Sequence, residues 1–235
     1  DRGRIQTPSG RCMVEDTIKP APELIVHKIR VIEGEILQDQ EAELQVDTKI
    51  RMATARNHTA THLLHAALRK ILGKHVRQAG SLVENKRLRF DFTHIQALTP
   101  DELRAVEEEV NAAILADLPV QTEIMDYNQA VARGAMALFG EKYGDQVRVV
   151  TVPGVSIELC GGTHLKRTGQ TGPFCIISES AVAAGVRRIE AITGHVSLSW
   201  LQKLKQEMED LQSLLKAGSG QLKSKVQSLQ EQIKT

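Results

Sequence analysis

The first 53 residues alternate short apolar runs with turn-forming residues. Three of these runs, Cys12–Ile18, Leu24–Ile32 and Ala42–Val46, have the length and the β-branched content of strands. Turn signals separate them at Pro8-Ser9-Gly10 and at Pro20-Ala21-Pro22. The pattern predicts a small β unit over residues 1–53, and this stretch shows no evident catalytic or ligand-binding motif.

The apolar spacing becomes helical after Thr54. Residues 55–72 are rich in Ala, Leu and His, and Gly73 is a typical helix stop. A second helix is predicted from Thr99 to about Ala116, because a proline and two acidic residues occupy its first turn. The other predicted elements are a short helix at Tyr127–Arg133 and strands at Val76–Val83, Leu88–Phe92, Val120–Met125, Val147–Val152, Val155–Leu159, Phe174–Ser178 and Val186–Ile192. Helices interleaved with hairpin-joined strands predict an α+β fold for residues 54–193.

Residues 194–235 carry a different pattern, typical of a coiled-coil helical segment. Apolar residues three and four apart favour helices with one apolar seam, and they fall at Leu201, Leu204, Met208, Leu211, Leu215, Leu222, Val226, Leu229 and Ile233. Residues 217–220 interrupt the pattern with two glycines and a serine. Either the two helical stretches pack on each other, or two chains form a homodimer along the seam. A single helix docked on the preceding domain is the alternative.

Composition narrows the classes of function. A formal net charge of +1 provides no global field that attracts nucleic acid or membranes, and the low aromatic content of 3% disfavours a base-stacking platform. The three cysteines, Cys12, Cys160 and Cys175, are too few for a secreted disulfide framework, and no apolar run approaches the length of a membrane span. We therefore expect a cytoplasmic protein in which Cys12 and Cys175 are buried small apolar side chains.

Two short motifs together predict a metal site. His58 and His62 are four residues apart in the predicted helix, so their imidazoles lie on one face, one turn apart. Far along the chain, Cys160 and His164 flank the pair Gly161-Gly162. Glycines that take positive φ angles would let this thiol and imidazole converge. Histidine and cysteine ligands in this number suit tetrahedral Zn²⁺.

The neighbours of these ligands limit the chemistry. Thr59 occupies the position where His-Glu-x-x-His zinc proteases carry their general base, so that class is disfavoured. His65 lies about 10 Å along the helix axis from His58 and cannot share a metal with it, so we expect it to be exposed or to support a ligand. Glu158 is expected to point away from the site or to pair with an arginine. Four protein ligands also fit a purely structural zinc, which stays open as an alternative.

Several longer motifs, in the same order, resemble the editing domain of bacterial alanyl-tRNA synthetase. The resemblance is dense over about residues 40–194 and looser on both sides. Free-standing alanyl-tRNA editing proteins and the threonyl-tRNA synthetase editing domain share the paired-histidine and Cys-x3-His core, and the long motifs match the alanyl enzyme best. The segments that carry the resemblance are residues 56–69, 78–83, 88–92, 134–144, 158–164 and 185–191.

The resemblance implies a hydrolase that acts on mischarged tRNA. Carried over by position, His58, His62, Cys160 and His164 match the zinc ligands of the family. The implied reaction removes serine or glycine from the 3′-terminal adenosine of tRNA(Ala), and Gln78 falls in the segment that the family places near the aminoacyl group. We expect Thr59 and Thr61 to line the same pocket, with packing or helix back-bonding as the alternative for both.

The resemblance also suggests how the chain holds tRNA and where its domains lie. Phosphate contacts to the acceptor end are expected from Arg187, Arg188, Lys70 and Lys74. Because Arg187 and Arg188 are consecutive in a predicted strand, they face opposite sides. The implied organisation is a small, incomplete β-barrel at 1–53, an editing domain at 54–193 and a coiled-coil connector at 194–235, in a chain that we expect to be an excised fragment. A non-catalytic, zinc-stabilised tRNA-binding module is the rival interpretation.

Overall fold

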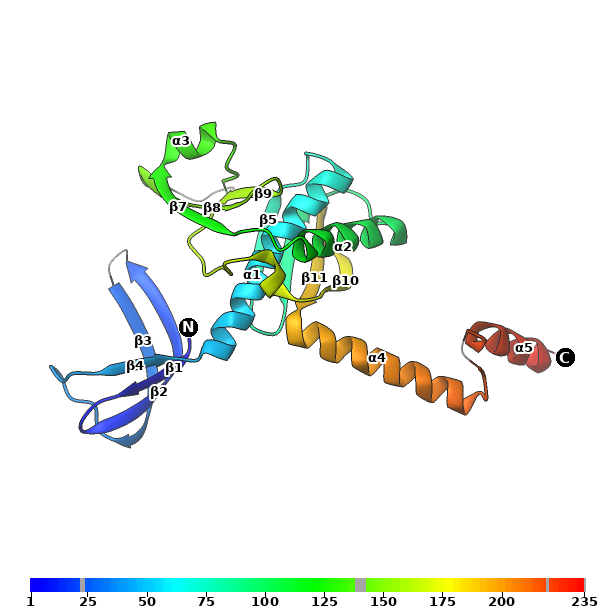
Figure 1. Ribbon diagram of the computed structural model, residues 1–235, viewed down its shortest axis with the longest axis horizontal. Coiled ribbons are helices and arrows are strands. Elements are labelled where there is room, and N and C mark those ends of the chain that lie inside the picture. Colours follow the sequence, from blue (N-terminus) through cyan, green and yellow to red (C-terminus); the bar gives the residue numbers. More distant parts are fainter. Residues whose placement is uncertain (22–23, 138–142, 219, 235) are drawn as a thin grey trace. The chain divides into compact units, whose positions relative to one another are not determined.

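A computed structural model describes residues 1–21, 24–137, 143–218 and 220–234 (Figure 1). The chain forms two compact units, Asp1–Gly194 and His195–Thr235. Within the described residues, helices combine with three antiparallel sheets, so the predicted α+β class is confirmed.

The N-terminal sheet is antiparallel and open. Its strands are β1 (Gly3–Gln6), β2 (Gly10–Ala21), β3 (Leu24–Gly34) and β4 (Glu43–Val46), in the order β3-β2-β1-β4. The pattern of the first residues did not reveal β1, which pairs with both β2 and β4. In the described part of the chain β3 and β4 form the two edges, so the expected barrel is not closed.

The first helix, α1 (Thr48–Leu72), begins seven residues before the predicted Ala55. The carboxylate of Asp47 accepts a hydrogen bond from the Ile50 N–H at 3.0 Å and so caps the helix. Its first turns expose residues such as Arg51 and Met52, so they lack the apolar face that reveals a helix in sequence. The predicted boundary at 53/54 therefore falls inside α1, and the division into domains at that point stays a prediction.

The ligand-bearing helix packs on a four-stranded antiparallel sheet. Its strands are β5 (Gln78–Val83), β6 (Leu88–Thr93), β10 (Phe174–Ala183) and β11 (Val186–Thr193), in the order β10-β11-β6-β5. α1 contacts β5, β6 and β11, while α2 (Pro100–Leu115) contacts α1 and β10 (Figure 1). The apolar core between these layers includes Leu64, Leu68, Phe90, Phe92, Val106, Val110 and Ile189. Burial of this face holds α1 rigidly in place.

The second predicted helix is confirmed and has a complete capping box. The Thr99 hydroxyl accepts a hydrogen bond from the Glu102 N–H at 3.2 Å, and the Glu102 carboxylate accepts one from the Thr99 N–H at 2.8 Å. We expect Thr99→Ala to lower the free energy of unfolding by about 1 kcal/mol, because one of these bonds is lost. Urea denaturation of both proteins measures the change. Thr99→Ser keeps the hydroxyl and should stay within about 0.5 kcal/mol of the wild type; equal losses in both variants would contradict the capping role.

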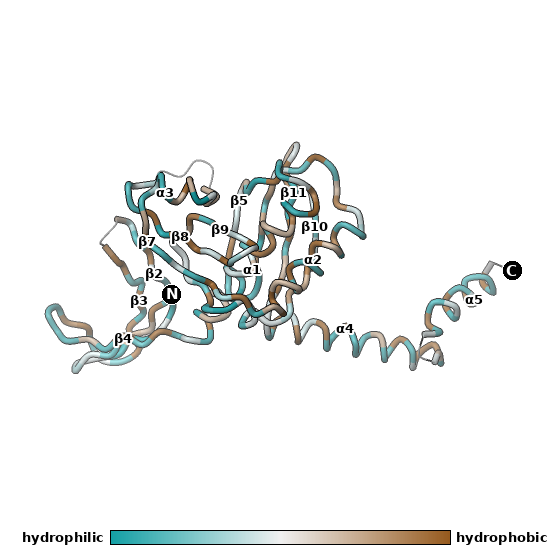
Figure 2. Tube along the Cα trace, turned by 45° about the horizontal axis from the view of Figure 1, so that its top comes forward, coloured by the Kyte–Doolittle hydropathy of each residue, from teal (hydrophilic) through white to brown (hydrophobic). Residues whose placement is uncertain are grey.

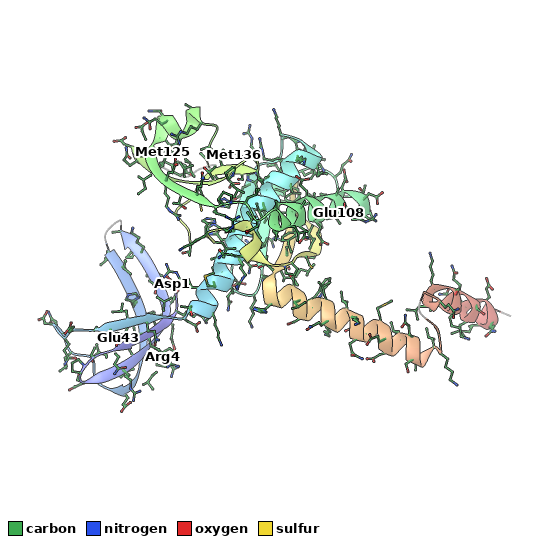
Figure 3. All side chains as sticks on the ribbon, viewed as in Figure 1. Asp1, Arg4, Glu43, Glu108, Met125 and Met136 are labelled. Atoms are coloured by element: carbon green, nitrogen blue, oxygen red, sulfur yellow. The ribbon has the colours of Figure 1, made fainter. Side chains whose placement is uncertain are left out.

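A third, smaller sheet leads into the second ligand pair. It consists of β7 (Gln121–Asp126), β8 (Gln146–Val152) and β9 (Ser156–Leu159), with α3 (Tyr127–Ala132) after β7. The predicted hairpin between β8 and β9 is confirmed by its antiparallel pairing. Met125, labelled in Figure 3, belongs to a separate apolar cluster with Ala130, Val149 and Leu159. Residues 138–142, part of one motif that carries the resemblance, lie outside the described residues.

The C-terminal unit is helical, as the spacing predicts. α4 spans Gly194–Leu214 and α5 spans Leu222–Lys234. Hydrophobic and hydrophilic residues alternate along both helices in Figure 2, and the predicted seam residues of α4 are exposed, for example Met208 at 48%. Homodimer formation along this seam stays a prediction. Among the described residues, no helix combines the length and the apolar character needed to cross a membrane.

Candidate metal centre

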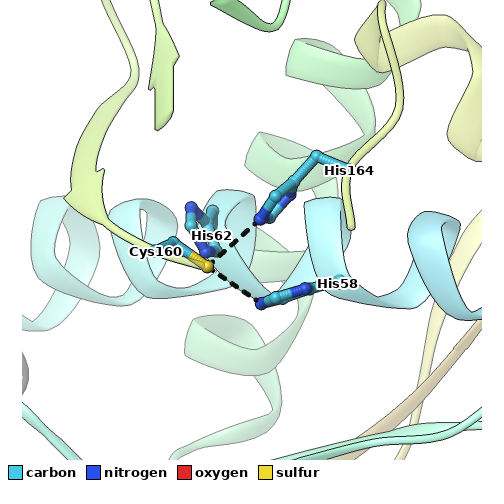
Figure 4. Close-up of side chains that lie close together, drawn as sticks. All are labelled: His58, His62, Cys160 and His164. Atoms are coloured by element: carbon cyan, nitrogen blue, oxygen red, sulfur yellow. Dashed lines mark hydrogen bonds between the residues drawn. The ribbon is translucent and has the colours of Figure 1, made fainter. Parts of the chain in front are cut away.

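Four side chains from two distant parts of the chain meet at one point. His58 and His62 come from α1, and Cys160 and His164 come from the loop that follows β9 (Figure 4). Each offers one ligand atom, and these atoms all lie within 4.8 Å of one another. The structure thus brings together the four residues that the sequence motifs paired.

The spacing of the four donors fits one tetrahedral metal ion. Cys160 Sγ lies 3.3 Å from His58 Nε2 and 3.2 Å from His164 Nε2. Bonds of about 2.0–2.3 Å from zinc to nitrogen or sulfur place neighbouring ligand atoms about 3.5 Å apart in a tetrahedron. Three imidazoles and one thiol suit Zn²⁺, which favours nitrogen and sulfur ligands, whereas Mg²⁺ and Ca²⁺ favour oxygen ligands. The residues present therefore fit a zinc ion.

The environment keeps the imidazoles in the neutral form that binds metals. Burial, followed by the charge of neighbouring His62, lowers the pKa of His58 to about 4 and the pKa of His164 to about 2. Burial also lowers the pKa of His62, against the opposing effect of Glu158. A neutral imidazole needs to lose no proton before it coordinates a metal, so these shifts favour binding at neutral pH.

The two glycines of the ligand loop have different roles. Neither Gly161 nor Gly162 has a positive φ angle, so the expected left-handed turn is wrong. Gly162 is needed for space: a Cβ atom there would overlap the imidazole of His58. At Gly161 an added Cβ would meet nothing within 4 Å. The loop backbone therefore passes directly against a ligand, and only a residue without a side chain fits at 162.

The threonines between the two histidines of α1 have partners inside the protein. Thr59 Oγ1 lies 3.2 Å from His164 Nδ1 and accepts a hydrogen bond from the Leu165 N–H at 3.2 Å. This contact orients His164 so that its Nε2 faces Cys160. Thr61 donates to the Asn57 carbonyl at 2.8 Å, which is the helix back-bonding alternative. That the two hydroxyls also line a substrate pocket stays a prediction.

The remaining predicted site residues are half-buried or exposed. They are Gln78 and the four predicted phosphate-binding residues. Gln78 is half-buried at the start of β5, and its role near the aminoacyl group stays a prediction. Arg187 forms a two-pronged ion pair with Glu179, with its Nη2 at 2.6 Å from the carboxylate. Arg188 forms a similar pair with Asp91 at 2.7 and 2.8 Å.

Arg187 therefore pairs with a residue of β10 and Arg188 with a residue of β6, so a carboxylate already neutralises each guanidinium. That the two side chains face opposite sides of the sheet stays a prediction. Lys70 lies 2.6 Å from Glu109, and Lys74 is exposed after the end of α1. A phosphate would have to compete with these carboxylates for Arg187, Arg188 and Lys70. Binding of phosphate by the four residues stays a prediction.

Glu158 is a site residue that the sequence interpretation placed wrongly. It is buried with 4% of its surface exposed, and Oε2 lies 3.9 Å from His62 Nδ1 while Oε1 lies 3.3 Å from His65 Nδ1. It does not point away from the site. Residues two apart on a strand share a face, so the spacing between Glu158 and Cys160 was the signal that could have found it.

His65 lies behind the ligands and is buried with 4% exposure, so the expectation of an exposed residue is wrong and the supporting role fits. Burial by itself raises the pKa of the Glu158 carboxyl, but His62, His65 and the Ser156 hydroxyl together lower it below the ordinary value. Glu158 is therefore a buried anion close to Nδ1 of His62, at 3.9 Å, which is beyond the length of a hydrogen bond, so it acts on this imidazole through its charge. Carboxylates beside the second ring nitrogen of a ligating histidine commonly support the tautomer and orientation that bind the metal, and the charge of Glu158 acts in the same sense over a longer distance.

We expect Glu158→Gln to lower the affinity for Zn²⁺ by about 10-fold, because a neutral amide orients His62 less strongly than a carboxylate. Competition with a chromophoric chelator measures the affinity. Glu190→Gln, a half-buried carboxylate that pairs with Arg87, serves as the matched control and should leave the affinity unchanged. Equal affinities for both variants would show that Glu158 does not support the metal centre.

Part of the chain matches a known family of domains. Residues 147–190 match the family described as the threonyl and alanyl tRNA synthetase second additional domain. This match runs from β8 to β11 and contains Cys160 and His164, whereas the α1 histidines lie before it.

Relatives with high identity extend the match over the whole chain. The chain is 59% identical to alanine–tRNA ligase of Nitratidesulfovibrio vulgaris and 54% identical to that of Oleidesulfovibrio alaskensis, in both cases over all of its 235 residues. The Thermotoga maritima enzyme is 51% identical over 234 residues. The chain spans 27% of the length of each of these relatives. The resemblance seen in the sequence is confirmed: the chain corresponds to the editing-domain region of alanyl-tRNA synthetases.

Proposed function

We propose that the chain hydrolyses the ester bond between serine or glycine and the 3′ end of tRNA(Ala), at a zinc centre formed by His58, His62, Cys160 and His164. The observation that carries this proposal is the convergence of the four donors within 4.8 Å in a chain whose whole length matches alanine–tRNA ligases. Transfer RNA is the proposed partner, and the proposed activity is that of an editing hydrolase within a ligase.

Elementary recognition chemistry explains the need for such a site. A pocket made for alanine cannot exclude glycine by size, and it gains only modest discrimination against a single added hydroxyl. A second site that forms a hydrogen bond with the serine hydroxyl can reject alanine far more strongly, because alanine would leave a buried polar group without a partner. Gln78 is our candidate for this contact.

The protein groups around the ion have separable roles. Bound zinc supplies a Lewis acid that polarises an ester carbonyl or a water molecule. Thr59 Oγ1 contacts His164 at 3.2 Å, and the Glu158 carboxylate lies 3.9 Å from His62; we propose that the two groups favour the ligating orientation of these imidazoles. We propose that backbone N–H groups of the Gly161-Gly162 turn stabilise the negative charge that develops on the ester oxygen.

One observation favours a second candidate function. Four protein ligands complete a tetrahedral shell, as in structural zinc sites, whereas catalytic zinc usually keeps a position for substrate or water. A non-catalytic, zinc-stabilised tRNA-binding module would use the same four residues. The two candidates differ in whether the zinc-loaded chain cleaves the ester.

The deciding experiment is a deacylation assay with the zinc-loaded 235-residue chain on tRNA(Ala) charged with serine, with glycine or with alanine. We expect release of serine to exceed release of alanine by at least about 100-fold. Treatment with a chelator should abolish the activity, and added Zn²⁺ should restore it. A zinc-loaded, folded chain that releases serine no faster than a protein-free control would establish the binding module instead.

A further inference from the structure

Arg148 connects β8 to the ligand loop by its backbone. It lies one residue beyond the last paired residues of the β8–β9 ladder, Val149 and Leu159. The carbonyl of Arg148 accepts a hydrogen bond from the Cys160 N–H at 2.9 Å. The backbone of the thiol ligand is therefore fixed to the strand that carries Arg148.

The side chain of Arg148 makes two further contacts with the same loop. Nη1 donates to the carbonyl of Cys160 at 2.8 Å and to the carbonyl of Gly162 at 2.6 Å. These bonds are short and charge-assisted, and the planar guanidinium loses little conformational freedom when it forms them. Because the two carbonyls flank Gly161, one half-buried side chain closes the turn between them.

The closed turn fixes the positions of Cys160 and His164, the two ligands that the loop contributes. Cys160 lies at its first residue, Gly162 packs against His58, and His164 follows two residues later. We propose that Arg148 is a positioning residue of the metal centre, whose two bonds to the loop carbonyls set Cys160 and His164 at the point that the α1 imidazoles reach.

The inference rests on the zinc centre of the proposed function and not on ester hydrolysis. Its test compares the wild-type chain with Arg148→Met, which keeps the length of the side chain and removes its donors. Arg133→Met is the matched control, because Arg133 pairs with Glu123 instead of the loop. Zn²⁺ affinity is measured by chelator competition, thiolate coordination by the thiolate-to-metal absorption of the Co²⁺-substituted chain, and metal-free stability by urea denaturation.

We expect Arg148→Met to lower the Zn²⁺ affinity by about 10- to 100-fold and to weaken the thiolate absorption of bound Co²⁺, with metal-free stability close to that of Arg133→Met. Arg148→Lys keeps the charge and some donor capacity, so its affinity should lie between the two. If Arg148→Met does not fold, Arg148→Lys against the wild type provides the comparison. An affinity within about twofold of the wild type, or a loss no larger than that of Arg133→Met, would overturn the proposal.

The outcomes separate this inference from the proposed function. If the wild-type chain binds Zn²⁺ but cleaves no ester, the proposed hydrolase activity is overturned. The Zn²⁺ affinities of the Arg148 and Arg133 variants then still decide the role of Arg148. A wild-type chain that binds no Zn²⁺ overturns the zinc centre and the positioning role together.

Discussion

Replacement of Cys160 by alanine is expected to reduce the affinity for Zn²⁺ by at least about 100-fold and to abolish deacylation of serine-charged tRNA(Ala). The thiolate is the one sulfur ligand in a set of four, and Cys160 Sγ lies 3.2–3.3 Å from two of the other three donors. The binding free energy of four-ligand zinc sites reaches about 10–16 kcal/mol, so the loss of one ligand removes a large share of it. Chelator competition measures the affinity, and the deacylation assay measures the activity.

Cys12, a buried cysteine of the N-terminal sheet, provides the control for this experiment. Cys12 is 1% exposed on β2, outside the ligand set, so Cys12→Ala removes a thiol without touching the site. It should retain zinc and activity. A Cys160→Ala chain that binds zinc as tightly as Cys12→Ala would remove Cys160 from the metal centre.

The second large effect is expected at Gly162. A Cβ at this position would overlap the imidazole of His58, so Gly162→Ala must displace either a ligand or the loop that carries two others. We expect a loss of Zn²⁺ affinity of about 10- to 100-fold, because small displacements of ligands are costly at a site of fixed geometry. Chelator competition measures the affinity, and circular dichroism confirms that the helices of the variant remain folded.

The neighbouring glycine makes the comparison sharp. Gly161→Ala adds the same methyl group one residue earlier, where nothing lies within 4 Å, and its backbone has no positive φ angle. Its affinity for zinc should match that of the wild type. If both variants lost the same Zn²⁺ affinity, alanine would disturb the loop in general, and the specific overlap with His58 would be contradicted.

Much of the fold was predictable because it depends on short-range chemistry. The start of α2 follows from Thr99, the proline after it and Glu102, whose capping contacts lie within three residues. The β8–β9 hairpin follows from two apolar runs around Pro153-Gly154. The start of α1 was missed because its first turns face solvent, where only the cap at Asp47 distinguishes helix from loop.

At the site, the spacing of the motifs identified the donors but not their surroundings. Glu158 and Arg148 were missed because their partners are remote in sequence or belong to the backbone, which carries no signal in a pattern of side chains. Glu158 faces His62 and His65 of α1, more than 90 positions earlier in the chain. Arg148 acts on the carbonyls of Cys160 and Gly162.

The sequence by itself determined the α+β class, the two ligand pairs and the resemblance to alanyl-tRNA synthetase editing domains, because periodicity, turn chemistry and motif spacing are local properties. Only the tertiary structure decided that the two pairs share one centre, that Gly162 is required for space, and that Glu158 and Arg148 support the ligands. These features arise where α1 packs beside the β8–β9 hairpin, and packing between distant segments is fixed by burial and shape, which no local pattern contains.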